Sequence, residues 1–183
     1  MSPRQTKKSS KTTKSNRNMK NAKYILAALA VAVLSSCKPT PKEAGYFNDR
    51  LMEQQRQVVI KYDELLETFD TYVPSKMDAA LIALSDQVAA ARQNVIGIEP
   101  IAGGEALKLG VLEYLTAIDD ATQDDFEYLV RLYKIPENEF TPELRIQWEE
   151  RYKDVDKRLK DAAEHLKGVQ AVFANDFHLN IAK

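Results

Sequence analysis

The spacing of apolar residues constrains this chain more than any other feature of its sequence. From Phe47 to Phe173, large apolar side chains recur at alternating intervals of four and three residues, which is the period of one face of an α-helix. The pattern is interrupted near Pro74, Pro100 and Pro136, because a proline inside a helix removes a backbone hydrogen bond. The sequence therefore predicts four helical segments.

Each predicted segment has one face that should be buried. Within these segments, no stretch alternates with the period of two that a half-buried strand needs. Four helices of about 23 to 35 residues with short connections pack best as an antiparallel up-down-up-down four-helix bundle, so the sequence predicts an all-α fold and one bundle domain over residues 46–183. The expected inward positions are Phe47, Leu51, Gln54, Val58, Tyr62, Leu65, Phe69 and Tyr72, then Met77, Leu81, Leu84, Val88, Ala91, Val95 and Ile98, then Leu107, Val111, Leu115, Ile118, Thr122, Asp125, Leu129 and Leu132, then Trp148, Tyr152, Val155, Leu159, Ala162, Leu166, Val169 and Phe173.

Local signals place the ends of the segments. Thr141 is a suitable N-cap, and Pro142 and Glu143 suit the first helical turn, so the fourth segment should begin there. The pair of glycines before Glu105 reads as the entry to the third segment. Prolines 39 and 41 favour extended backbone, so residues 37–45 are expected to form a short tether.

The C-terminal tail does not follow the helical period. Phe177, Leu179 and Ile181 alternate with polar residues, which suits an extended strip. Such a strip either folds back over the bundle or stays exposed as a docking peptide for a partner. Folding back is favoured, because it removes three large apolar side chains from water.

Three polar residues, Gln54, Thr122 and Asp125, fall on the expected inward faces. In one interpretation they form a polar interior that binds a small ligand. In the other the inward face drifts, because 3.6 residues per turn does not match a repeat of seven, and Phe126 and Val130 replace Asp125 inside. The second interpretation is favoured. The aromatic residues are likewise expected in the core rather than around a ligand.

The sequence contains no complete catalytic or metal-binding motif. A di-iron bundle needs Glu-x-x-His, but the residues three before His165 and His178 are Ala162 and Asn175. The acidic run at 119–127 has no loop glycine and follows a helical pattern, so a solvated helix face is expected there. We therefore expect neither a metal nor a cofactor nor an enzyme, although a triad assembled in space leaves a hydrolase as a further alternative.

The charges are divided unevenly along the chain. Residues 1–36 carry eight basic and no acidic residues, so the rest of the chain holds 18 of the 26 basic residues and all 27 acidic ones. An acidic body lacks the basic face that nucleic acid binding requires. No nucleic acid partner is expected for the mature protein.

The basic stretch is followed by eleven mostly apolar residues, 24–34, and then by the only cysteine, Cys37. About 20 apolar residues are needed to span a bilayer, so this segment fits a signal peptide over residues 1–36 instead. Translation could start at Met1 or at Met19, and both give the same mature protein. A single cysteine excludes a disulfide within the chain.

The four residues Leu34, Ser35, Ser36 and Cys37 resemble the lipobox of bacterial lipoproteins. The resemblance implies cleavage before Cys37 and a covalent lipid, palmitate included, on its sulfur. Lys38 after the cysteine implies retention in the outer membrane, on its periplasmic face or at the cell surface. The general layout is also similar to small helical surface or outer-membrane lipoproteins of Bacteroidota and leptospires.

These observations predict a lipid-anchored envelope protein whose helical domain is not catalytic and contacts a protein partner or the envelope. The alternative from another class is a sensory or small-ligand-binding helical bundle.

Overall fold

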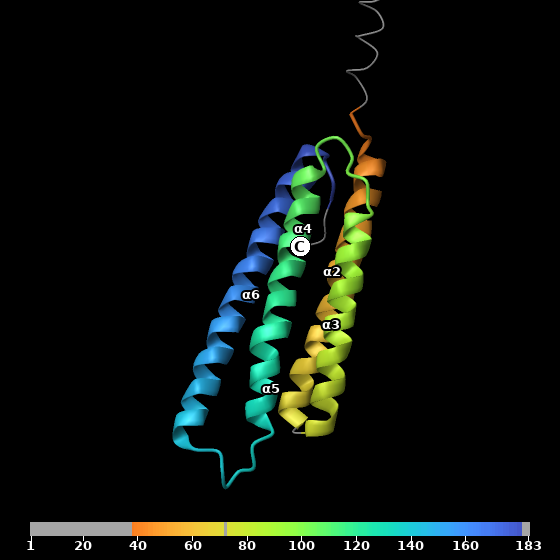
Figure 1. Cartoon of the computed structure of the whole chain (residues 1–183). Helices are drawn as coiled ribbons and strands as arrows, with labels where there is room; N and C mark the ends of the chain where they lie inside the picture. The colour runs from red at the N-terminus through yellow and green to blue at the C-terminus, as the bar shows by residue number, and fades with distance from the viewer. Residues whose placement is uncertain (1–37, 72, 181–183) are drawn as a thin grey trace, which may run out of the picture. The chain divides into compact units, whose positions relative to one another are not determined.

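A computed structural model describes residues 38–71 and 73–180 of the chain. These residues are helical apart from the connections and the ends, and they contain no strand (Figure 1). The predicted all-α class with four helices is therefore confirmed. Cys37, the signal segment, Tyr72 and Ile181 lie outside the described residues. The helical elements are α2 (Pro41–Thr71), α3 (Pro74–Ile96), α4 (Glu105–Asp120), the π-helical turn η1 (Ala121–Phe126), α5 (Glu127–Tyr133) and α6 (Pro142–Asp176).

Successive helices pack against one another around a common core. α2 contacts α3 and α4, α3 also contacts α4, and α6 contacts both α4 and α5. Elements α4, η1 and α5 follow one another without a break and form the third of the four helices. Most of the fully buried side chains come from the predicted inward faces, among them Leu51, Val58 and Leu65 of α2, Met77, Leu84 and Val88 of α3, Leu107, Leu115 and Leu129 of the third helix, and Val155 of α6, which is 1% exposed.

The first helix begins earlier than predicted. Pro41 occupies its first turn, where a missing N–H costs nothing, and Thr40 caps it. The Thr40 backbone N–H donates to Glu43 Oε2 at 2.7 Å, and the Glu43 N–H donates to Thr40 Oγ1 at 3.3 Å. This reciprocal capping box lowers the pKa of Glu43. The expected extended tether over 38–45 is therefore wrong from Pro41 onward.

The start of α6 agrees with the sequence. Thr141 is extended, with φ −74° and ψ 161°, and its hydroxyl accepts a hydrogen bond from the backbone N–H of Leu144. Pro142 follows in the first turn. The predicted N-terminus of the fourth segment is confirmed.

The π-helical turn η1 changes which residues point inward. In an α-helix, consecutive residues are 100° apart, so two neighbours rarely share the centre of one buried face. The wider π turn reduces this angle. Asp125 and Phe126 are both buried, with 3% and 0% of their surface exposed, and so is Val130. Phe126 and Val130 lie inside as predicted, but the expectation that they replace Asp125 is wrong.

The part of the tail that the structure describes, up to residue 180, folds back as predicted. α6 ends at Asp176, and His178 adopts a left-handed conformation with φ 54°. The N–H of Leu179 donates to the Ala174 carbonyl at 2.8 Å and the N–H of His178 to that of Asn175 at 3.2 Å, which is a Schellman motif. Phe177 and Leu179 then pack partly buried against the core.

Candidate functional site

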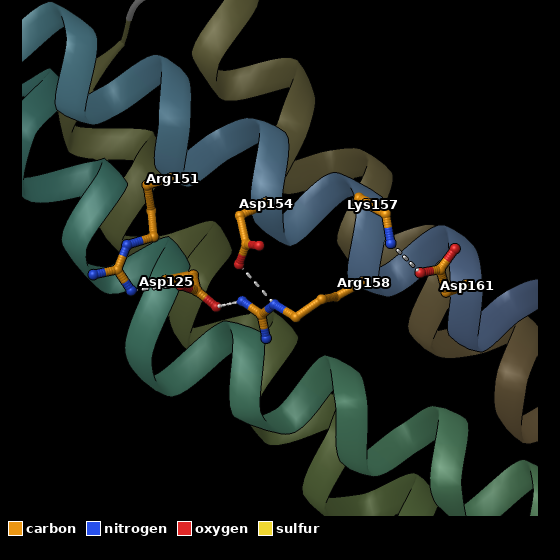
Figure 2. A network of polar contacts seen from close by, with 6 residues as sticks. All are labelled: Asp125, Arg151, Asp154, Lys157, Arg158 and Asp161. Carbon is orange, nitrogen blue, oxygen red and sulfur yellow. Dashed lines mark hydrogen bonds and ion pairs between the residues drawn. The ribbon is translucent and has the colours of Figure 1, made fainter.

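The most elaborate polar arrangement in the described residues joins η1 to α6 (Figure 2). The side chain of Asp125 is only 4% exposed. Its Oδ1 accepts a hydrogen bond from Arg151 at 2.7 Å, and its Oδ2 accepts one from Arg158. Arg158 also donates to Asp154 at 3.0 Å. A buried carboxylate thus has both oxygens paired with guanidinium groups.

The electrostatics of this cluster keep both arginines charged. The hydrogen bond that Arg151 donates to Asp125 raises the pKa of Arg151, and the bond that Arg158 donates to Asp125 raises the pKa of Arg158. The Arg151 guanidinium also lies 5.1 Å from the centre of the Tyr128 ring, within the range of a cation–π contact. Tyr128 in turn donates its hydroxyl hydrogen to Gln147 of α6 at 2.9 Å.

A surface hollow of about 410 Å³ lies over this cluster. Because both oxygens of Asp125 are engaged, the carboxylate is not available as a general base. The arginines are likewise held by carboxylates, so they are not a vacant anion site. The arrangement acts as a clamp that fixes α6 on the π turn. The hollow is lined by Asp125, Tyr128, Gln147, Glu150, Arg151, Asp154 and Arg158.

The other two predicted interior polar residues have separate partners. The Thr122 hydroxyl donates to the Ile118 carbonyl of its own helix at 2.7 Å. Gln54 is partly buried, and its side-chain oxygen accepts a hydrogen bond from Asn94 of α3 at 2.9 Å. In the described part of the chain, no hydrogen bond joins Gln54, Thr122 and Asp125 to one another.

Sequence reasoning missed the two arginines that pair with Asp125. The signal was present, because Arg151 and Arg158 are seven residues apart and therefore lie on one side of α6. Both flank Val155, which is buried. A basic pair beside the buried face of one helix, facing an acidic residue on the buried face of another, indicates such a clamp.

The acidic run at 119–127 is not uniformly solvated. Asp119 pairs with Arg92 of α3, and Asp125 is buried, whereas Asp120, Asp124 and Glu127 are exposed. The expectation of a solvated face is thus wrong for two residues of the run. His165 lies 3.3 Å from Glu113 at an exposed position, and His178 lies two residues beyond the end of α6.

A second hollow, of about 540 Å³, lies where α5 connects to α6. Tyr133, Phe140 and Trp148 contribute aromatic side chains to it, and Glu137, Arg145 and Glu149 contribute charged ones. The expectation that the aromatic residues belong to the core is confirmed for Phe69 and Tyr114, whereas Tyr62, Trp148 and Tyr152 are only partly buried.

Comparison with protein-family models, curated proteins and solved structures gave no match. None of the described helices combines the length and the apolar character that a membrane crossing requires. Within residues 38–71 and 73–180, no three His, Cys, Asp or Glu side chains are grouped as a metal site requires.

Proposed function

We propose that this protein is a bacterial lipoprotein, anchored through a lipid on Cys37, whose helical domain binds a partner protein or another component of the cell envelope. The observation that carries this proposal is the sequence Leu34–Ser35–Ser36–Cys37 at the end of a basic and apolar leader. The outer membrane is the proposed location, on the basis of Lys38.

The early start of α2 limits how far the helical domain can lie from the proposed lipid anchor. Only residues 38–40 separate Cys37 from Pro41, the first helical residue. Four extended steps span at most about 14 Å. A lipid on Cys37 would therefore hold the beginning of α2 close to the headgroups of the bilayer, and the domain would not stand on a long stalk.

Replacing Cys37 by serine tests the anchor. Each buried methylene of an acyl chain contributes about 0.8 kcal/mol, so two or three chains hold a protein on the membrane almost permanently. Cys37→Ser should move the protein from the membrane pellet to the soluble fraction and abolish incorporation of labelled palmitate. Ser36→Ala is the matched control, because it keeps a small residue before the cysteine and should retain both the label and the membrane location. Palmitate labelling that persists in Cys37→Ser would contradict the proposal.

We further propose the antiparallel up-down-up-down topology for the four helices. Short connections and the contacts between successive helices support it, as does the bond from Asn94, near the end of α3, to Gln54 in the first half of α2. A spin label attached to the thiol that Tyr46→Cys introduces, in a chain that also carries Cys37→Ser, should broaden amide signals near Ile96. Broadening near Ala79 instead would indicate a parallel pair.

A further inference from the structure

The hollow at the α5–α6 connection has the properties of a small-molecule site. Its volume of about 540 Å³ lies within the usual range for ligand pockets. It is formed by the end of α5, the connection and the first two turns of α6. Figure 1 shows this connection at the end of the helices away from the beginning of α2. The hollow therefore lies at the end of the helical domain opposite the beginning of α2, and its lining residues, 133–149, do not include Cys37.

Two of the aromatic residues that line this hollow, Trp148 and Tyr133, are held in place by contacts with other rings. The Trp148 ring stacks on Tyr152, with ring centres 5.1 Å apart and an angle of 5° between the planes. The Tyr133 ring meets Phe69 edge-on at 5.3 Å, and its hydroxyl donates to the Phe69 carbonyl at 2.6 Å. The Trp148 ring also packs against Phe69 and Tyr133, with ring centres 6.5 Å and 6.0 Å away, so its position at the edge of the hollow is fixed.

No ion pair within residues 38–71 and 73–180 involves the charged side chains around the hollow. Glu137, Arg145 and Glu149 form no ion pair with any described residue, although all three line the same space. This contrasts with the nearby arginines of α6, Arg151 and Arg158, which are paired with Asp125. Two carboxylates against one guanidinium give the rim a net negative charge. A ligand of opposite charge would supply the missing partner.

We propose that this hollow binds a small organic ammonium ion. The face of an aromatic ring carries negative charge and attracts cations, most strongly in tryptophan, and Glu137 and Glu149 add full negative charges beside it. An anionic ligand would be disfavoured, because the rim would repel it with two carboxylates and attract it with only one guanidinium. A neutral apolar ligand would take water from these charges without replacing their interactions. A compact cation with an apolar surface can interact with the aromatic rings and with the carboxylates of Glu137 and Glu149 at the same time.

The only tryptophan of the chain lies in this site, so its fluorescence reports binding directly. Choline chloride is the probe, and the full-length protein in detergent is titrated. We expect a saturable change in Trp148 emission with a Kd of about 1 mM or tighter. Sodium chloride at equal ionic strength and 3,3-dimethylbutan-1-ol, which has the shape of choline without its charge, should produce no saturable change.

Two variants locate the binding. Glu149→Gln and Phe140→Ala should each weaken choline binding by about tenfold, because they remove a carboxylate and an aromatic wall. Glu150→Gln is the matched control: it is the same change one residue further along α6, at a residue that lines the other hollow. Melting curves of all variants show whether the fold is kept. An absent response to choline, an equal response to the neutral alcohol, or unchanged affinity in both site variants would overturn the proposal.

Discussion

Replacing Arg151 and Arg158 together by methionine is expected to lower the free energy of unfolding by about 3–5 kcal/mol. The double variant leaves Asp125, whose side chain is 4% exposed, without either of its guanidinium partners. When a buried carboxylate loses its partners, its desolvation penalty remains, and the hydrogen bonds and ion pairs that offset this penalty are lost. Urea unfolding at neutral pH, applied to the compact unit Pro39–Lys183, measures the change.

A triple variant separates the cost of the orphaned charge from the loss of arginine packing. Adding Asp125→Leu to the double variant should recover most of the lost stability, since an apolar side chain of similar size replaces the buried charge. Lys157→Met is the matched control, because it removes one partner of the Lys157–Asp161 pair on the same helix. Both side chains of that pair, which is drawn in Figure 2, are exposed, so its loss should change the free energy of unfolding far less than loss of the two partners of Asp125. If the triple variant is no more stable than the double, Asp125 is not the origin of the effect.

The sequence was sufficient to predict the four helices and most of their buried faces, because both depend on local patterns. Apolar residues at helical spacing became the buried positions of the core. The cap at Thr141 formed as predicted, since its hydrogen bond involves only residues within three positions. Thr40, Pro41 and Glu43 repeat the same Thr-Pro signal at the start of α2. This start was not predicted, because Pro39 and Pro41 also favour extended backbone and the apolar period begins only at Phe47.

The polar clamp could not be derived in the same way. Whether Asp125 or Phe126 faces inward depends on the helical period at η1, and a fixed repeat allows only one of the two. The partners of Asp125 are 26 and 33 residues further along the chain, on a different helix. We infer that their pairing offsets the cost of burying the carboxylate. Such pairing depends on tertiary packing, which the order of residues in one helix does not reveal.

The direction of the tail at Phe177 and Leu179 was predicted correctly, but the turn that produces it was not. The alternation of Phe177 and Leu179 indicated an extended strip, and these residues do turn back onto the core. The turn is made by the left-handed His178, a position at which glycine is usual. Histidine adopts the left-handed conformation more readily than bulky or β-branched residues do. Because it is not the glycine that usually marks such a turn, the residue type at position 178 did not indicate one.

Truncating both tail residues, Phe177→Ala with Leu179→Ala, is expected to destabilise the domain by about 2–3 kcal/mol. Complete burial of each side chain would be worth roughly 1.5–3 kcal/mol, and both are only partly buried. The Phe177 ring also lies against Gly103, where an added Cβ would be 3.3 Å from the ring. The melting temperature should fall by about ten degrees.

Two further variants make this last prediction specific to the folded-back tail. Val172→Ala, at a position of α6 that is 62% exposed, should change stability by about 0.5 kcal/mol or less. His178→Gly should act in the opposite direction and stabilise the domain by up to about 1 kcal/mol, because φ 54° costs a side chain more than it costs glycine. A tail that serves only as an exposed docking peptide would respond to none of these changes. If the double alanine variant melts like the wild type, the packing of Phe177 and Leu179 contributes nothing to the fold. The stabilising effect of glycine at 178 depends on the same turn, and it should disappear when Leu179 is also replaced by alanine.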